Sequence, residues 1–179
     1  MVRKGAYYSR GLTLIELLIT LVILAILIST VRASYYALFA HQALIQRAEK
    51  LHRILSLTSS QAIRKNSVVY AHFCPMQVSG AWQVITTDVD NCDCININSC
   101  LFDGLLVSEQ ISDGNKVSTS AADINFSSQQ ASYGAMRFNV NTGSVKFSTP
   151  DGAQLKVIQS TMRLRICSPN EALLGYKKC

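Results

Sequence analysis

The hydrophobic pattern divides the chain into two parts of different character. From Leu12 to Val31 almost every side chain is apolar, and beyond Val31 apolar positions recur at helical spacing as far as Ala62. Neither glycine nor proline occurs between Leu12 and Pro75. A run without these helix breakers permits one continuous helix. The sequence therefore predicts a long helix over residues 12–66, whose second half is amphipathic.

The first half of this helix has the length of a membrane span. About twenty residues at 1.5 Å each cover about 30 Å, the thickness of a bilayer's hydrocarbon core. The leader before it is basic, and basic residues stay on the cytoplasmic side. We therefore expect one membrane-spanning segment at about residues 12–31. A cleaved signal peptide and a plain signal anchor are the alternatives, but a signal peptide has a shorter apolar core followed by a small-residue cleavage site.

Residues 67–179 have the pattern of short β-strands. Strand-like runs cover 68–73, 81–87, 135–140, 144–149, 154–159 and 162–167. Asn141-Thr142-Gly143 separates two of these runs, and its composition predicts a hairpin turn. Two polar loops, at 88–104 and 112–123, interrupt the pattern. The expected fold class is therefore α+β, with a long N-terminal helix packed on a C-terminal antiparallel β domain.

All six cysteines follow the apolar helix. An even number of cysteines in an exported domain indicates disulfides. The sequence leaves open how Cys74, Cys92, Cys94 and Cys100 are connected. A zinc site is the alternative for the dense cluster at 92–100, but its C-x-C spacing differs from the paired C-x-x-C of structural zinc. We therefore expect no metal.

Cys167 and Cys179 are expected to pair with each other. They flank a segment that contains Pro169 and Gly175, two residue types suited to a closed loop. Closing a loop of this size would stabilise the fold by about 3 kcal/mol.

The formal charge of +6 is unevenly distributed. Residues 67–160 hold four basic and eight acidic residues, whereas the last nineteen residues hold four basic residues and one acidic residue. The four basic residues at the C-terminus are Arg163, Arg165, Lys177 and Lys178. On a strand, Arg163 and Arg165 would project to one side because they are two positions apart. This cluster is a candidate for binding DNA phosphates, and a solvated basic face is the alternative.

The sequence contains no convincing catalytic constellation. It has no phosphate-binding loop, no zinc-protease motif and no serine elbow. His72 and Cys74 share a strand face and could form a nucleophile pair, but in an oxidising compartment a disulfide is the expected state of Cys74. We therefore expect neither an enzyme nor a cofactor.

Glu16 is the one acidic residue within the apolar run. A carboxylate at the centre of a bilayer costs about 2.5–3.5 kcal/mol, so it needs a compensating cation or a purpose. A tolerated polar residue near the membrane interface is the alternative.

The block Gly11-Leu12-Thr13-Leu14-Ile15-Glu16-Leu17-Leu18, which follows a basic leader, resembles the type III signal of type IV pilins and pseudopilins. The resemblance implies that prepilin peptidase removes residues 1–11 by cutting between Gly11 and Leu12, and then methylates the new N-terminus. Leu12 stands where the family usually has Phe. The new α-amine at Leu12 would then be the nearest cation for Glu16, on the same subunit or on a neighbour. In pilins the glutamate at the position of Glu16 is implicated in bringing each subunit into register during assembly.

The C-terminal half resembles the GspH/FimT group of minor pilins and pseudopilins. The resemblance rests on Arg137-Phe138-Asn139-Val140-Asn141-Thr142-Gly143-Ser144-Val145 and on the strand at 163–167. Some FimT-like pilins bind DNA through a Gly-Arg-x-Arg element. The corresponding Met162-Arg163-Leu164-Arg165 lacks the glycine.

These resemblances imply a minor type IV pilin that takes part in the initiation or capping of pilus assembly. Its expected partners are prepilin peptidase, other major and minor pilins or pseudopilins, and the bacterial inner membrane, with the C-terminal domain in the periplasm. A minor pseudopilin of a type II secretion system and a DNA-binding minor pilin for natural transformation are the alternatives.

Overall fold

The computed structural model describes residues 13–136, 139–173 and 175–179. The helix is α1 (Leu14–Lys65), and the strands are β1 (Val69–Pro75), β2 (Ala81–Thr87), β3 (Val107–Asp113), β4 (Gln130–Tyr133), β5 (Gly143–Ser148), β6 (Gln154–Gln159) and β7 (Leu164–Cys167). Three short 3₁₀ helices are η1 (Ile97–Ser99), η2 (Ala121–Asp123) and η3 (Ser127–Gln129). The chain forms two units, of which one ends at Leu38 and the other runs from Phe39 to Cys179.

The bounds of α1 follow from local chemistry at its two ends. At the start, the Glu16 N–H donates to the Thr13 hydroxyl at 3.3 Å, the bond by which a threonine caps a helix. At the end, Asn66 has a φ of 51°, and the Ser67 N–H donates to the Ala62 carbonyl at 3.2 Å. A left-handed residue with this bond closes a helix C-terminus.

The first unit contains the part of α1 that was expected to cross a membrane. Residues 13–29 are helical from Leu14 onward. Within the described part of the chain, no helix has a stretch that is both long and apolar enough to span a bilayer. The expected span at 12–31 is therefore not seen, and Leu12, where it would begin, lies outside the described residues.

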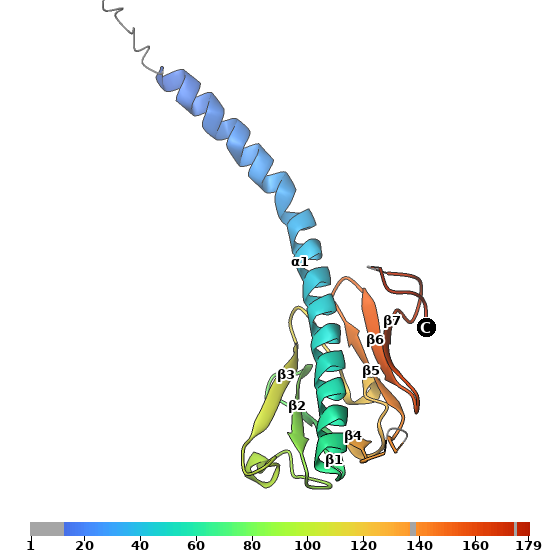
Figure 1. The fold of residues 1–179 in the computed structure, drawn as a ribbon. Helices are drawn as coiled ribbons and strands as arrows, with labels where there is room; N and C mark the ends of the chain where they lie inside the picture. Colours follow the sequence, from blue (N-terminus) through green and yellow to red (C-terminus); the bar gives the residue numbers. More distant parts are fainter. Residues whose placement is uncertain (1–12, 137–138, 174) are drawn as a thin grey trace, which may run out of the picture. The chain divides into compact units, whose positions relative to one another are not determined.

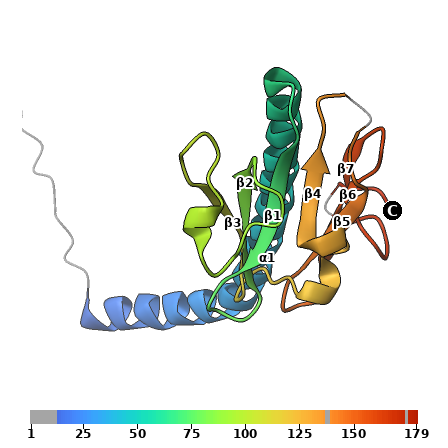
Figure 2. The ribbon, with the colours of Figure 1, turned by 90° about the horizontal axis from the view of Figure 1, so that it is seen from below.

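The second unit contains two antiparallel sheets (Figure 1). The larger sheet has the order β3-β2-β1-β4, and the smaller one has the order β5-β6-β7. Residues 39–65 of α1 lie against both sheets, as the view from below in Figure 2 also shows. The expected α+β architecture of a helix packed on an antiparallel β domain is confirmed.

One hydrophobic core joins the helix to both sheets. Its buried residues include Leu44, Ala48, Leu51 and Leu55 of α1, Val69, Ala71 and Phe73 of β1, Val84 of β2, Val145 and Phe147 of β5, and Leu155 and Val157 of β6. The helical members are three or four positions apart, so they form one stripe on α1. The strand members alternate with residues on the opposite sheet face, as the two-residue period of a strand requires.

The outer face of the larger sheet is covered by a disulfide-closed loop, residues 88–103. Cys74 of β1 is bonded to Cys94, and Cys92 is bonded to Cys100. Cys74, Cys100 and Ile85 form a second buried cluster beneath this loop. The cysteines whose pairing the sequence left open are therefore all in disulfides, and Cys74 offers no free thiol to His72.

His72 lies under the same loop and has a structural environment. Its ring nitrogen Nε2 is 3.3 Å from the Val89 carbonyl oxygen. Burial lowers the pKa of His72, which favours the neutral ring. The contact between the neutral His72 ring and the Val89 carbonyl therefore helps to hold the loop against the sheet.

The expected hairpin around Asn141-Thr142-Gly143 is wrong. β5 pairs with β6, and Val140 forms an isolated bridge with Tyr133. The Asn141 side chain accepts a hydrogen bond from the Ser132 N–H and donates one to the Gln130 carbonyl, both at 2.7 Å. This amide takes the place of a backbone partner along β4. Residues 141–143 therefore connect the larger sheet to β5 of the smaller sheet and do not form a hairpin turn. Residues 137 and 138 of the expected strand lie outside the described residues.

Candidate functional site

The N-terminal site is described only from Thr13 onward. The expected cleavage residues, Gly11 and Leu12, lie outside the described residues. Glu16 lies in the first turn of α1, where a negative charge interacts favourably with the helix dipole. Thr13-x-x-Glu16 also has the spacing of a capping box. Sequence analysis missed this local role, although the spacing was available to indicate it.

The helix after Glu16 exposes an apolar surface on every side. All large apolar side chains described between Leu14 and Ile28 are more than half exposed, with values from 51% to 83%. Thr20 and Ser29 donate their hydroxyls to carbonyls one turn back, so they add little polar surface. A continuous apolar surface of this length indicates a site that other molecules cover.

The second candidate site lies on the outer face of the smaller sheet. Lys146 of β5 is directly opposite Lys156 of β6, and Ile158 of β6 is opposite Arg165 of β7. These side chains alternate along the strands with buried core residues, so they lie on the face turned away from α1. Arg163 immediately precedes β7 and is exposed, as is Arg165. The expectation that Arg163 and Arg165 project to the same side of the strand is therefore compatible with the pairing of β6 and β7.

The C-terminal tail lies beside β7. Ser168 donates its N–H to the Lys177 carbonyl and accepts the Cys179 N–H, both at 2.9 Å. Cys167 and Cys179, which were expected to pair, are joined by a disulfide. Together these bonds hold Lys177 and Lys178 next to the strand that carries Arg165.

The tail is also tied to the helix. The Tyr176 hydroxyl donates to Glu49 Oε1 at 2.9 Å. Burial, and then the neighbouring Glu49 carboxylate, raise the pKa of Tyr176 to about 12, so this hydroxyl keeps its proton. The tail therefore has a fixed place on the domain, which fixes the backbone that carries Lys177 and Lys178.

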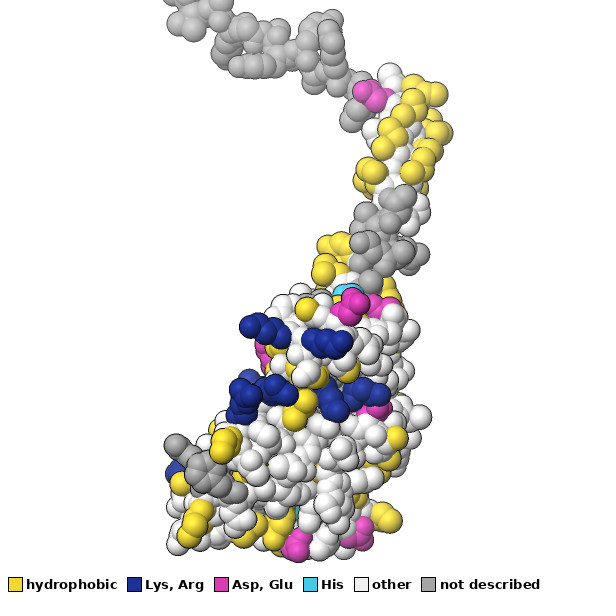
Figure 3. All heavy atoms as spheres, turned by 90° about the vertical axis from the view of Figure 1, so that its right-hand side faces the viewer, with side chains coloured by type: hydrophobic (Ala, Val, Ile, Leu, Met, Phe, Trp, Pro, Cys, Tyr) yellow, Lys and Arg dark blue, Asp and Glu magenta, His cyan; other side chains and the backbone are white. Residues whose placement is uncertain are grey.

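We call the surface formed by Lys156, Arg163, Arg165, Lys177 and Lys178 the basic face. Figure 3, which shows the side of the molecule with β7, displays lysine and arginine side chains gathered across this surface. None of the five takes part in an ion pair among the described residues. Lys146, by contrast, lies 2.6 Å from Asp123. Burial alone would raise the pKa of Asp123, but hydrogen bonds from Lys146 and Ser120 hold that pKa below its usual value.

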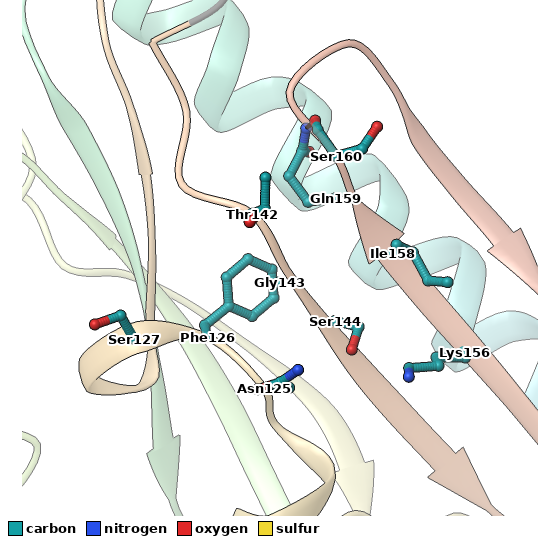
Figure 4. A pocket seen from close by; sticks show the side chains of 10 residues that line it. All are labelled: Asn125, Phe126, Ser127, Thr142, Gly143, Ser144, Lys156, Ile158, Gln159 and Ser160. Atoms are coloured by element: carbon teal, nitrogen blue, oxygen red, sulfur yellow. Dashed lines mark hydrogen bonds between the residues drawn. The ribbon is translucent and has the colours of Figure 1, made fainter.

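A groove of about 660 Å³ opens next to Lys156 (Figure 4). It is lined by Asn125, Phe126, Ser127, Thr142, Gly143, Ser144, Lys156, Ile158, Gln159 and Ser160. Gly143 is required here, because an added Cβ would lie 2.3 Å from the Phe126 ring. The lining combines one ammonium group with hydroxyls, amides and apolar carbon. It has no carboxylate, so it suits an anionic ligand that also carries an apolar side chain.

The sequence indicated only part of this second site. It grouped Arg163 and Arg165 with Lys177 and Lys178, but it missed Lys156 and the groove. The alternation of β6, in which Lys156 and Ile158 face away from the core, was the signal that could have placed both residues on the outer face.

Two family models match the chain. Residues 47–173 match the family described as type II transport protein GspH. Residues 7–31 match the prokaryotic N-terminal methylation motif. A comparison with curated proteins and one with solved structures gave no match. The first model covers most of the chain, including both sheets and α1 from Arg47 onward, and the second covers the expected cleavage site and Glu16.

Proposed function

This chain belongs to the GspH family and is a type IV pilin-like minor pilin or pseudopilin, and from this membership we propose that it takes part in the initiation or capping of a type IV pilus. The observation that carries the proposal is the presence of both matches in one chain. The methylation motif implies processing by prepilin peptidase and assembly with other pilins or pseudopilins. The function is structural, so we propose no catalytic residue.

The described geometry supports an assembly role. The apolar surface between Leu14 and Ile28 needs cover along its whole length, and helices of neighbouring subunits would supply it. The β domain is closed by three disulfides, which suits a protein that leaves the reducing cytoplasm. We further propose that the chain is held at the inner membrane before assembly, with residues 67–179 in the periplasm.

Deletion of the gene tests this function. We expect the number of pili per cell to fall severalfold while the remaining pili keep their normal length, because a subunit needed for initiation limits how many filaments start. Electron microscopy of negatively stained cells measures both quantities, and the unaltered gene supplied in trans is the control. Normal pilus number in the deletion strain would contradict the proposal.

The printed name of the matched family supports a second candidate, a minor pseudopilin of a type II secretion system. The same deletion strain separates the two. A pseudopilin predicts that pilus number stays normal while secreted enzymes accumulate in the periplasm. Enzyme activity in the culture supernatant and in a periplasmic extract measures this accumulation.

The basic face supports a third candidate, a DNA-binding minor pilin. This candidate predicts that the full chain in a non-ionic detergent binds duplex DNA without sequence preference at low salt. Replacing Arg163 and Arg165 with Gln should weaken binding about tenfold or more, and the matched change of Arg53 and Arg64 to Gln on α1 should have a much smaller effect. Raising salt from 50 to 200 mM should also weaken binding strongly, because phosphate contacts release counterions. Fluorescence anisotropy measures both effects, and no change in anisotropy at low salt would eliminate this candidate.

A further inference from the structure

We propose that the basic face of one subunit binds the disulfide-closed loop, residues 88–103, of a second copy of this chain. The inference deepens the proposed assembly function, because it names the two surfaces that meet. The proposed function is needed only to explain what the contact does in the cell. The contact itself can be tested with the purified protein, whatever its role in the cell.

The five cations of the basic face have no ion-pair partner among the residues that the structure describes. Lys156 lies directly opposite Lys146 across β5 and β6, and like charges in opposite positions destabilise a sheet. Asp123 neutralises Lys146, but Lys156 and the cations of β7 and the tail have no carboxylate among their described ion-pair partners. A partner with carboxylates at suitable positions would therefore stabilise this surface.

The loop carries the opposite charge. Residues 88–103 contain Asp88, Asp90, Asp93 and Asp103 but no lysine or arginine. Lys65 pairs with Asp88 and Asp103. Asp90 accepts a hydrogen bond from the Gln130 amide at 2.9 Å, and neither Asp90 nor Asp93 forms an ion pair in the part of the chain that the structure describes. Their charges are available to an external cation.

The tip of the loop is rigid and presents an apolar side chain. Ile95 is 96% exposed, and its N–H donates to Asp93 Oδ1 at 2.9 Å. Two disulfides and the hydrogen bond from the Asp93 N–H to the Ser99 hydroxyl hold this conformation. A loop that is already ordered loses little conformational freedom when it binds. It therefore presents an isoleucine beside a carboxylate in a fixed arrangement.

The basic face has a matching arrangement. Ile158 lines the groove together with Lys156 and is directly opposite Arg165. An apolar side chain of a partner could contact Ile158 while the adjacent carboxylate meets Lys156 or Arg165. Ile95 and Asp93 at the loop tip have this combination, which is why we assign the loop as the occupant.

The two surfaces cannot meet within one subunit. The loop covers the outer face of the larger sheet, and the basic face lies on the outer face of the smaller one. Figures 1 and 2 both show β7 and the segment after β2 on opposite sides of the helical part of this unit. The contact must therefore join different copies. Because the surfaces differ, it is heterologous and can continue from subunit to subunit.

A charge exchange in the full chain, purified in a non-ionic detergent, tests the contact. The first variant carries Arg163→Glu and Arg165→Glu on the basic face. The second carries Asp90→Lys and Asn96→Lys on the loop, and it spares Asp93 so that the turn at Ile95 is kept. Asn96 is exposed, and its side chain does not cap η1. Analytical ultracentrifugation of each protein and of their equimolar mixture measures association.

We expect each variant alone to self-associate at least about tenfold more weakly than the unaltered chain, because like charges then face each other. The mixture should recover association to within about threefold, because each altered surface finds the opposite charge on the other variant. Association through the apolar helices is the same in all samples and cannot produce this pattern. Recovery in the mixture also shows that both variants are folded.

Three results would overturn the proposal. Either variant could associate as strongly as the unaltered chain, or the mixture could fail to recover association. The arginine variant could also lose DNA binding while its self-association stays unchanged, which would make nucleic acid the occupant of the basic face. None of these results concerns pilus number, so the proposed function would stand or fall by the deletion experiment.

Discussion

The chain recovered from its host should begin at Leu12 and carry a methylated N-terminus, and replacing Gly11 with Val should leave it at full length. The match to the methylation motif covers this junction. A β-branched residue at the cut position would hinder close approach of the chain to the peptidase, because glycine alone lacks a side chain there. Intact-mass spectrometry of the extracted protein distinguishes the two forms directly.

The leader offers its own control for this experiment. Gly5 lies before the junction, so Gly5→Val changes the same residue type within the same segment and should leave processing intact. A mature chain that still begins at Met1, or one cut beyond Val31, would contradict processing as a pilin. Loss of processing in both variants would mean that the leader as a whole, and not Gly11, is read.

The fold was accessible from the sequence where one local pattern dominated. The absence of helix breakers gave α1 to within two residues at each end, and the β-branched residues within 81–87 and 154–159 gave β2 and β6 at their observed bounds. β3 was missed, because its residues mix exposed and buried positions without clear alternation. Its place is set by contacts distant in sequence, such as the 3.5 Å pair between Arg47 of α1 and Asp113.

The hairpin error shows a second limit. Asn141-Thr142-Gly143 has good turn chemistry, but the Asn141 amide forms its hydrogen bonds with the backbone of β4. Turn propensity describes the conformation that three residues favour by themselves. Here the hydrogen bonds of Asn141 to β4 outweigh that propensity, and no hairpin turn forms. The same holds for the pairing of Cys74 with the three cysteines of the loop, because which sulfurs meet depends on how the loop lies across β1.

The candidate sites were predictable to different degrees. Gly11, Leu12 and Glu16 lie within one short motif, residues 11–18, so the sequence alone sufficed to propose them. The basic face is assembled from β6, β7 and the tail, and its members are up to 22 positions apart in the chain. Lys156 joins it only through the strand register. Such a surface becomes visible once the sheet order is known.

Replacing Glu16 with Ala should prevent the chain from entering filaments without preventing its association with the membrane fraction. Removing a carboxylate lowers the cost of placing this helix in an apolar environment, so membrane association should be kept. The α-amine of a processed chain would then lose its partner among apolar side chains. Loss of one member of a buried charge pair costs more than the roughly 1.4 kcal/mol that corresponds to a tenfold change. Recovery of the variant in sheared pili should therefore fall about tenfold or more.

The capping-box spacing of Thr13 and Glu16 supplies the competing explanation, and three further variants separate the two. If Glu16 acts only by helping to begin the helix beside Thr13, Thr13→Ala should impair assembly similarly, because it removes the capping hydroxyl at a cost of about 1 kcal/mol. Glu16→Gln should then be harmless, because glutamine also suits this position of a capping box. If the charge is required, Glu16→Gln should fail as Glu16→Ala does, whereas Thr13→Ala should assemble.

Thr20→Val, which removes a polar group one turn further along, should assemble normally under either explanation. Immunoblotting of sheared pili against whole cells measures all four variants, and full recovery of Glu16→Ala would exclude a role for this residue in assembly.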